Sequence, residues 1–326
     1  MTEPAAIPAP IAVDIHDLRV DYGETVAVDG LTLAIPFGEV FGLVGPNGAG
    51  KTSTFRVLAT LLEPTYGRVH IAGHHIADAT SQARAALGYM PDLAPVPSDL
   101  KVWEFLDCFA AAHGITHNRR GRCDDCLAEV SLGDKRNVFC NELSRGMKQR
   151  LVLAKTLLHA PKVMVLDEPA SGMDPVSRAA LKATVKQLAK QGSTVIVSSH
   201  ILGELADMCS TVGLMQHGKL VDSGPVQAVA DRATSGSRRM VARTTTGMGG
   251  TVGDWLGRHG HVEAVETSGD RVVFAFRGGP DDEAGLLRAM VLDGLPVRQF
   301  GEDGSALERA VLGLKSGSAK GGNAHE

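Results

Sequence analysis

The chain contains no uncharged apolar run approaching the ~20 residues that a membrane-spanning helix requires, so any membrane step must rely on another polypeptide. The formal net charge is -4, without the strong positive charge typical of nucleic-acid-binding proteins. The 5 cysteines are an odd number at irregular spacing, which argues against a disulfide framework and favours a reducing compartment. Residues 1–10 lack the basic segment and apolar core of a signal peptide and are expected to form a disordered extension.

The chain is 326 residues long, a length that favours two domains. Up to about residue 230, apolar runs alternate with helical patterns. The almost wholly apolar runs are expected to be strands buried on both faces, at 40–44, 163–166 and 194–197. Further strands are predicted at 11–20, 31–35 and 69–72, and helices at 51–61, 103–112, 124–130 and 144–159. This order predicts an α/β domain in which helices cover a mainly parallel sheet.

A glycine-rich turn follows the first buried strand. Residues 45–52 read Gly-Pro-Asn-Gly-Ala-Gly-Lys-Thr and match the phosphate-binding loop pattern at every specified position. Glycines allow backbone N–H groups to approach a phosphate, and the positive end of the next helix faces the anion. We expect Lys51 to reach the terminal phosphates and Thr52 to coordinate Mg²⁺. The predicted nucleotide-binding residues here are Gly45, Pro46, Asn47, Gly48, Ala49, Gly50, Lys51, Thr52 and Ser53.

Two carboxylates end the buried run at 163–166. Asp167 and Glu168 therefore lie at the carboxyl end of a parallel strand, where α/β folds bind ligands. We expect Asp167 to hold Mg²⁺, directly or through water, and Glu168 to orient or deprotonate the attacking water. A strand that ends in an acid is common, so this interpretation depends on the phosphate-binding loop upstream.

A second possible anion site precedes that strand. Residues 143–150 read Leu-Ser-Arg-Gly-Met-Lys-Gln-Arg, which places a hydroxyl and a glycine at a helix N-terminus. This segment resembles the signature motif of ATP-binding cassette (ABC) ATPases, usually Leu-Ser-Gly-Gly-Gln, in a form common in ATPases that pair with exporter permeases. Arg145 and Met147 stand where the family more often has Gly and Gln. The nucleotide contacts that the resemblance implies here are Ser144, Arg145, Gly146 and Met147.

Further residues follow the order of motifs in the same family. Tyr22 is similar to the aromatic residue that stacks on adenine, and residues 171–174 resemble the D-loop, which ends at Asp174. His200, after the strand at 194–197, is similar to the switch histidine that contacts the γ-phosphate. The resemblance covers about 11–227 and implies a P-loop NTPase fold of the ABC type, with a mixed sheet and a helical subdomain at about 92–160.

Asp92 departs from the family pattern, which usually has Gln at this position. The resemblance implies that this residue senses Mg²⁺ and the attacking water, and that its loop contacts the permease. Aspartate is shorter and charged. It can still approach the metal, so we include Asp92 among the predicted metal ligands with Thr52 and Asp167, but a carboxylate beside Glu168 changes the local field.

Ala, Ser, Gly and Arg dominate the segment around Ala230 to Arg238, which suggests a linker. The region after it has a different pattern. Its predicted order is strand, helix, strand, strand, helix, strand, which matches the split β-α-β arrangement of ferredoxin-like domains. A final short helix is predicted to run to about Leu314. The expected organisation is a disordered extension at 1–10, an ABC ATPase domain at 11–230, a linker at 231–238, a small α+β domain at 239–314 and a disordered tail at 315–326.

A possible zinc motif has a simpler interpretation. Cys123 and Cys126 form a CxxC, with Cys140, His113 and His117 nearby, but no second CxxC accompanies it and the spacing of these residues fits zinc sites poorly. Because 124–130 is expected to be an amphipathic helix, we expect Cys126, Leu127 and Val130 to be buried apolar positions.

The resemblance implies an ATPase that uses ATP and Mg²⁺ and acts as a head-to-tail dimer. Lys51, Glu168 and His200 are the expected catalytic residues, and Ser144 and Gly146 are expected to close over ATP held by the other subunit. The implied partner is a transmembrane permease for export, and the implied location is the inner face of the cell membrane, on the cytoplasmic side, without a nucleic-acid partner. Two alternatives stay open: a soluble ABC ATPase acting on ribosomes or DNA, and a regulator that binds ATP without turnover.

Overall fold

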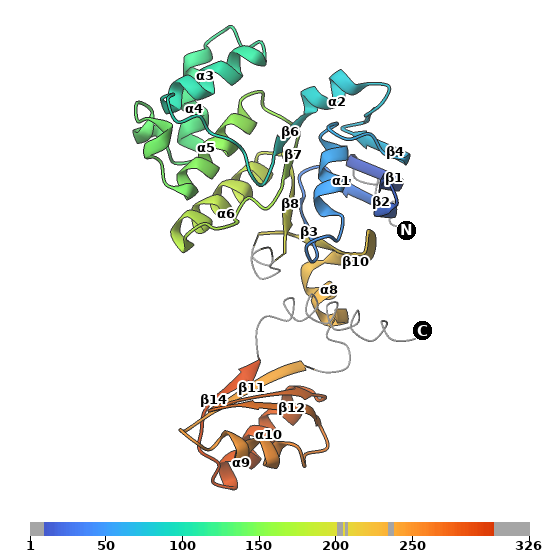
Figure 1. The fold of residues 1–326 in the computed structure, drawn as a ribbon, viewed down its shortest axis with the longest axis vertical. Coiled ribbons are helices and arrows are strands. Elements are labelled where there is room, and N and C mark those ends of the chain that lie inside the picture. Colours follow the sequence, from blue (N-terminus) through green and yellow to red (C-terminus); the bar gives the residue numbers. More distant parts are fainter. Residues whose placement is uncertain (1–9, 201–204, 206–207, 234–237, 303–326) are drawn as a thin grey trace, which may run out of the picture. The chain divides into compact units, whose positions relative to one another are not determined.

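The structure is a computed structural model that describes residues 10–200, 205, 208–233 and 238–302. The chain divides into two compact units, Met1–Val226 and Gln227–Glu326 (Figure 1). The predicted extension at 1–10 lies almost wholly outside the described residues, as do the final helix and the tail beyond residue 302. Among the described residues, no helix has both the length and the apolar character needed to cross a membrane.

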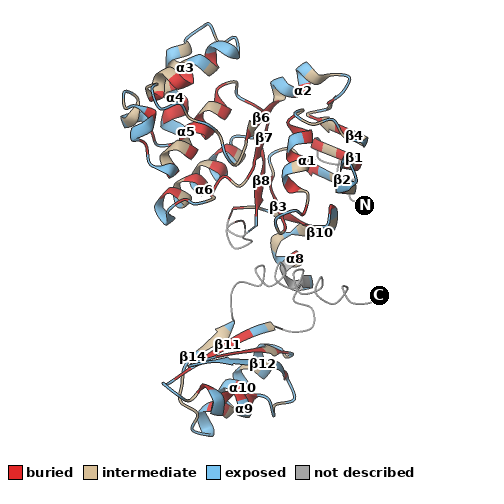
Figure 2. Ribbon diagram, viewed as in Figure 1, coloured by how far each residue is buried: buried red, intermediate tan, exposed pale blue. Residues whose placement is uncertain are grey.

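The first unit is built on a mixed six-stranded sheet, ordered β10-β9-β3-β8-β7-β6. Its strands are β3 (Val40–Val44), β6 (Leu87–Met90), β7 (Val163–Leu166), β8 (Thr194–Ser199), β9 (Thr211–Gln216) and β10 (Lys219–Pro225). All neighbours pair in parallel except β9 and β10, which form an antiparallel hairpin. Every residue of β3, β7 and β8 is buried, as their apolar sequences predict. Figure 2 shows this burial along β7 and β8.

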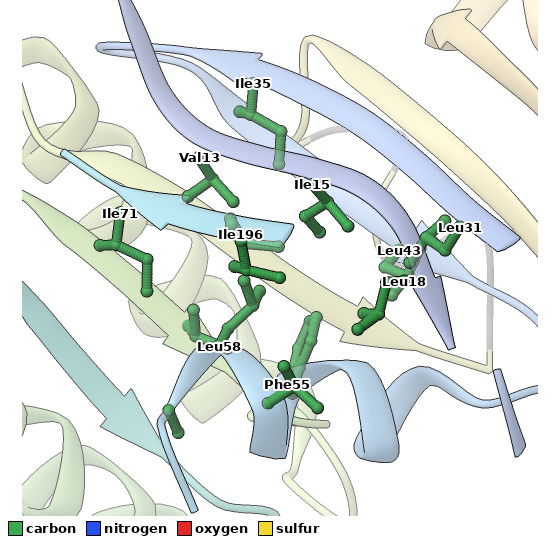
Figure 3. Close-up of a cluster of buried hydrophobic side chains, with 14 of the residues drawn as sticks. Val13, Ile15, Leu18, Leu31, Ile35, Leu43, Phe55, Leu58, Ile71 and Ile196 are labelled. Carbon is green, nitrogen blue, oxygen red and sulfur yellow. The ribbon is translucent and has the colours of Figure 1, made fainter. Parts of the chain in front are cut away.

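A second, antiparallel sheet has the order β2-β1-β4-β5. It consists of β1 (Ile11–Tyr22), β2 (Thr25–Pro36), β4 (Tyr66–Ile71) and β5 (His74–His75). Helix α1 (Lys51–Leu58) contributes Phe55 and Leu58 to an apolar cluster that also contains Ile15 of β1 and Ile196 of β8 (Figure 3). Since both sheets and α1 share this cluster, the start of α1 is held firmly at the edge where β3 ends.

Helices α3 (Val102–Ala112), α4 (Arg119–Glu129) and α5 (Arg145–Leu157) lie in the predicted helical subdomain. Helix α4 begins at Arg119, before the predicted start at residue 124, and the residue before it, Asn118, has a left-handed backbone. Cys126, Leu127 and Val130 are buried, as predicted. Burial also raises the pKa of the Cys126 thiol to about 12, so it stays protonated at neutral pH.

Within the described residues of this unit, two complete α-helices are not among the predicted elements. One is α2 (Thr80–Ala86), and the other is α6 (Pro175–Lys190). Helix α6 begins with two standard start signals, since Asp174 accepts a hydrogen bond from the Ser177 backbone N–H at 2.9 Å and Pro175 occupies its first turn. The sequence predicted the D-loop at residues 171–174 but not the helix that begins directly after it.

The second unit contains β11 (Arg238–Thr244), α9 (Gly249–Leu256), β12 (Val262–Ser268), β13 (Arg271–Phe276), α10 (Pro280–Leu292) and β14 (Val297–Glu302). This is the predicted order of elements. The strands form one antiparallel sheet, ordered β12-β13-β11-β14. That order is the one a split β-α-β arrangement requires, because β13 lies between β11 and β12.

The boundary between the units differs from the predicted linker at 231–238. Helix α8 (Val226–Ala233) covers the first part of that segment, and β11 already begins at Arg238. The alanine-rich composition that was interpreted as a linker suits a helix equally well, and Val229 is fully buried.

Candidate active site

The loop between β3 and α1 adopts a backbone that only glycine accommodates easily. Gly48 and Gly50 have φ angles of 81° and 102°, in the left-handed region. A Cβ atom on Gly50 would also collide with the carbonyl oxygen of Ala27 in β2. Gly50 is the residue just before the first residue of α1, so its conformation sets the direction in which the helix N-terminus points.

Lys51 is folded back over this loop. Its Nζ donates to the carbonyl oxygen of Gly45 at 2.7 Å and to that of Pro46 at 3.3 Å, and lies 3.7 Å from Oε1 of Glu168. The side chain is 6% exposed. Burial lowers the pKa of Lys51, and the nearby carboxylates of Glu168 and Asp167 oppose that shift. A buried ammonium held by weak backbone acceptors is well placed to bind a stronger anion.

Asp167 is fixed by the neighbouring strand. Its carboxylate Oδ1 accepts a hydrogen bond from the Ser198 hydroxyl at 2.6 Å, and the Ser198 oxygen accepts one from the Glu168 backbone N–H at 2.8 Å. Asp167 and Ser198 are each 1% exposed. The parallel pairing of β7 with β8 brings these strand ends together. Ser198 therefore holds both acidic residues, a role that was not predicted for it.

Glu168 has a φ angle of 46°, which is unusual for a residue other than glycine. Its Oε2 lies 2.8 Å from Nδ1 of His200, which follows the end of β8. The histidine side chain is 45% exposed and that of Glu168 is 14% exposed. The strained backbone and the two side-chain contacts aim the carboxylate into the space above Lys51.

A single pocket with a volume of about 630 Å³ is lined by Lys51, Glu168 and His200 together with other residues. Its lining residues are Thr25, Val26, Ala27, Asn47, Gly48, Ala49, Gly50, Lys51, Thr52, Ser53, Asp92, Glu168, Ser171 and His200. The structure thus brings together most of the predicted loop, Glu168, His200 and Asp92, which lie far apart in the sequence. The three β2 residues were not predicted, because only the packing of β2 against the loop places them there. Ser171 is the first residue of the predicted D-loop segment.

Asp92 lies at the wall of this pocket. Burial raises the pKa of its carboxyl group, and the charges of Asp167 and Glu168 raise it further, while Arg145 and His200 act in the opposite direction. Its Oδ1 is buried without a hydrogen-bond partner among the described residues. Its carbonyl oxygen accepts a hydrogen bond from Nε2 of Gln149 in α5, at 3.0 Å. The loop that carries Asp92 is therefore tied to the helix that begins with the signature segment.

The signature residues are not part of this pocket lining within the described chain. Ser144 caps α5, and its hydroxyl oxygen accepts a hydrogen bond from the Met147 backbone N–H at 3.3 Å. A Cβ atom on Gly146 would lie 2.5 Å from the Ser177 hydroxyl oxygen, so the start of α5 packs tightly on α6. Ser177 in turn donates its hydroxyl hydrogen to Asp174 at 2.7 Å, and this bond lowers the pKa of Asp174.

Four further predicted residues lie outside the pocket lining, namely Gly45, Pro46, Tyr22 and Asp167. The carbonyl oxygens of Gly45 and Pro46 accept hydrogen bonds from Lys51. The side chain of Tyr22 is exposed at the end of β1, and its hydroxyl oxygen lies 3.5 Å from that of Ser53. An exposed aromatic ring beside the phosphate-binding loop suits stacking on a base. Asp167 lies just below the pocket, where Ser198 covers one of its two carboxylate oxygens.

The chain is similar to several known proteins. A family model described as "ABC transporter" matches residues 28–171. The probable multidrug ABC transporter ATP-binding protein YbhF of Escherichia coli (strain K12) is 34% identical over 218 residues, which are 67% of this chain and 38% of that protein. The chain therefore spans well under half of the length of YbhF.

A second relative is matched over most of its own length. The Nod factor export ATP-binding protein I of Burkholderia pseudomallei (strain K96243) is 33% identical over 213 residues, which are 65% of this chain and 70% of that protein. Among solved structures, an ATP binding subunit of an ABC transporter has a TM-score of 0.62 and 26% identity, and the match covers 68% of this chain and 92% of that chain.

Proposed function

We propose that this chain, which belongs to the family of ABC transporter ATP-binding proteins, binds ATP in the pocket above Lys51 and hydrolyses it to ADP and phosphate. One observation carries the proposal. A buried ammonium group, a strained and oriented carboxylate and a glycine-rich helix start line the same pocket. A binding site for a neutral ligand does not need this combination.

The β- and γ-phosphates fit against Lys51 and the backbone N–H groups of residues 47–52. In the free protein, Nζ of Lys51 is held by carbonyl oxygens and by Glu168. Phosphate oxygens are stronger acceptors than carbonyl oxygens, so ATP takes over these contacts. The positive end of α1 adds to the attraction. Tyr22 stacks on the adenine ring at the open side of the loop.

Glu168 is the general base. A water molecule between its carboxylate and the γ-phosphate attacks phosphorus, the bond from phosphorus to the β–γ bridging oxygen breaks, and the water proton passes to Glu168. His200 orients Glu168 through their 2.8 Å contact and is near enough to bind the γ-phosphate. Ser198 keeps the strand ends in register, since it bonds both Asp167 and the backbone of Glu168.

The residues present fit Mg²⁺. This ion prefers carboxylate and hydroxyl oxygens, and it is usually held by one or two carboxylates together with substrate phosphates. Thr52 supplies a hydroxyl, Asp167 keeps one carboxylate oxygen that Ser198 does not occupy, and Asp92 has a buried Oδ1 without a partner among the described residues. When bound, Mg²⁺ neutralises charge on the phosphates and so favours attack.

The signature segment acts in a second copy of the chain. The helix start formed by Ser144, Arg145, Gly146 and Met147 is capped, tightly packed and outside the lining of the pocket in its own chain. The family resemblance implies that these residues close over ATP held by the partner. Asp174 lies beside them at the start of α6. We place this head-to-tail dimer at the cytoplasmic face of a membrane, coupled to a separate permease that exports an unidentified substrate.

Phosphate release from Mg²⁺–ATP by the purified chain tests the core of the proposal. We expect release that depends on both Mg²⁺ and Lys51. ATP binding with no release, alone or with a permease present, would favour instead the regulator that binds ATP without turnover. Absence of ATP binding at millimolar concentration would reject the proposal.

A further inference from the structure

The sheet of the second unit has two faces, and α9 and α10 cover one of them. The cluster beneath these helices includes Met240 and Ala242 of β11 and Val272 and Phe274 of β13. Because successive side chains in a strand point to opposite faces, Val241 and Val273 point away from the helices. We call the face that carries them the open face.

One row of residues crosses the open face on all four strands. Val273 pairs with Glu266 on one side and with Val241 on the other, and Val241 pairs with Gly301. Each valine is only 6% exposed, although within the described residues 238–302 neither belongs to the cluster on the helix side. A Cβ atom on Gly301 would meet nothing within 4 Å. The row therefore combines two shielded apolar side chains with space for another.

One border of this row is positively charged. Arg243 and Arg271 stand directly opposite each other on β11 and β13. Like charges at such a position repel each other, so a carboxylate between them is stabilising. On the other side of the valines, Arg239 forms an ion pair with Glu266 at 3.2 Å. A segment that fits the open face is therefore apolar along its centre and acidic along one border.

The sequence after β14 has this character. Residues 305–314 read Ser-Ala-Leu-Glu-Arg-Ala-Val-Leu-Gly-Leu and lie outside the described residues. The helix predicted there places Leu307, Ala310, Val311 and Leu314 in one stripe, at the spacing of an amphipathic helix. At 100° per residue, Glu308 falls at the border of this stripe and Arg309 on the opposite side.

We propose that residues 305–314 of the same chain dock on the open face as a helix, with the apolar stripe over Val241 and Val273 and Glu308 beside Arg243 and Arg271. Strand β14 ends at Glu302, next to β11. Residues 303 and 304 join Glu302 to Ser305 in three Cα-to-Cα steps, which span up to about 10 Å, comparable with the ~10 Å between a sheet and a layer packed on its face. The open face of a second copy is a poorer occupant, because it would set arginines against arginines.

Disulfide trapping tests which segment lies on the face. In the full-length chain with the exposed Cys108 replaced (Cys108→Ser), Val241→Cys is combined with Val311→Cys, from the apolar stripe. The matched control combines Val241→Cys with Arg309→Cys, from the opposite side of the predicted helix. We expect mild oxidation of dilute protein to link the first pair within one chain and to leave the control pair reduced.

Three outcomes of this experiment overturn the proposal. They are no link in either pair, equal links in both pairs, and a link that joins two chains. The last outcome would assign the face to the same segment of a second copy.

A second measurement does not depend on cysteine geometry. The alkylation rate of a Val273→Cys thiol is measured in the full-length chain and again with Leu307→Asp or Arg309→Asp added, after subtraction of the rate for the parent cysteines. We expect Leu307→Asp to increase the rate by about tenfold or more, since it releases the cover, and Arg309→Asp to leave it unchanged. Equal rates in all three chains would show that the arginine side chains alone shield Val273, and would overturn the proposal.

Discussion

His200 holds Glu168 through a contact of 2.8 Å between Nδ1 and Oε2. The other carboxylate oxygen of Glu168 lies 3.7 Å from Nζ of Lys51. The carboxylate of Glu168 is therefore oriented before the substrate arrives. Glu168 follows the end of β7 and has a left-handed backbone. Such preorganisation separates groups that bind ATP from groups that act on it, and the two sets can be tested separately.

Glu168→Gln is expected to keep ATP affinity and to lower phosphate release by about 100-fold or more, the range for loss of a general base. The amide is nearly isosteric but cannot accept the water proton. ATP should then accumulate in a dimer, visible by gel filtration with nucleotide. Glu63→Gln, at an exposed position, is the control. Near-wild-type release by Glu168→Gln would remove Glu168 from the role of base.

Lys51→Ala is expected to weaken ATP binding and to eliminate hydrolysis. Because burial lowers the pKa of Lys51, its ammonium loses the proton at lower pH than an exposed lysine does. ATP affinity should therefore fall as pH rises through that lowered pKa, whereas Lys51→Arg, which stays charged, should show a flatter profile. Titrations with nucleotide up to about pH 10 check this. Parallel profiles for the two chains would contradict it.

The same pKa shift predicts how the stability of the free protein depends on pH. Between the lowered pKa and the pKa in the unfolded chain, the folded state binds fewer protons, so the contribution of Lys51 to the free energy of unfolding rises with pH. Denaturant unfolding of the wild type and Lys51→Met at several pH values measures this contribution as the difference between the two.

Ser198→Ala is expected to lower the free energy of unfolding by about 1–3 kcal/mol, because it leaves buried groups of Asp167 and Glu168 without their partner. It should also reduce phosphate release, since the Glu168 backbone loses an anchor. Ser98→Ala, at an exposed position, serves as the control in urea unfolding and in the ATPase assay. If stability and activity are both unchanged, Ser198 is not the anchor that the geometry indicates.

Gly50→Ala is expected to damage nucleotide binding far more than Gly48→Ala. Both substitutions force a left-handed backbone on alanine, at a cost of about 1–3 kcal/mol. Only at Gly50 does the new methyl group also meet the carbonyl oxygen of Ala27, whereas at Gly48 it meets nothing within 4 Å. Thermal unfolding and ATP titration compare the two variants. Equal effects would mean that backbone strain alone matters.

Asp92→Asn is expected to remove a pH-dependent penalty. The raised pKa of Asp92 means that the folded state binds more protons than the unfolded chain between the unfolded and folded pKa values. The contribution of Asp92 to stability therefore falls as pH rises through that window. The stability advantage of Asp92→Asn over the wild type should grow with pH across the window and then level off. Unfolding curves from acid to neutral pH test this, and an advantage independent of pH would contradict it.

The sequence predicts most of this site because its chemistry depends on short contiguous segments. Residues 45–52 and Asp167–Glu168 follow buried apolar strands, and parallel strands place their carboxyl ends at one edge. Ser198 was missed because its role depends on the strand order: β8 had to be known as the neighbour of β7 before its hydroxyl could be placed against Asp167.

The predicted linker shows a different limit. Alanine, serine and glycine near residue 230 were interpreted as linker composition, yet α8 occupies Val226–Ala233. Local composition does not distinguish a short helix with a buried residue such as Val229 from an irregular connection. The D-loop was predicted without α6. Two local signals for the helix start are present, since Asp174 is a favourable N-cap residue and Pro175 a favourable first residue.

The close approach of Gly146 to Ser177 has an evolutionary consequence. A methyl group at position 146 would lie 2.5 Å from the serine oxygen, so the two positions share one small volume. Alanine at 146 becomes tolerable only when 177 is reduced to glycine, and a bulkier residue at 177 requires that 146 remain glycine. In a deep collection of related sequences, these two positions should therefore change together, as a pair linked by size rather than by charge.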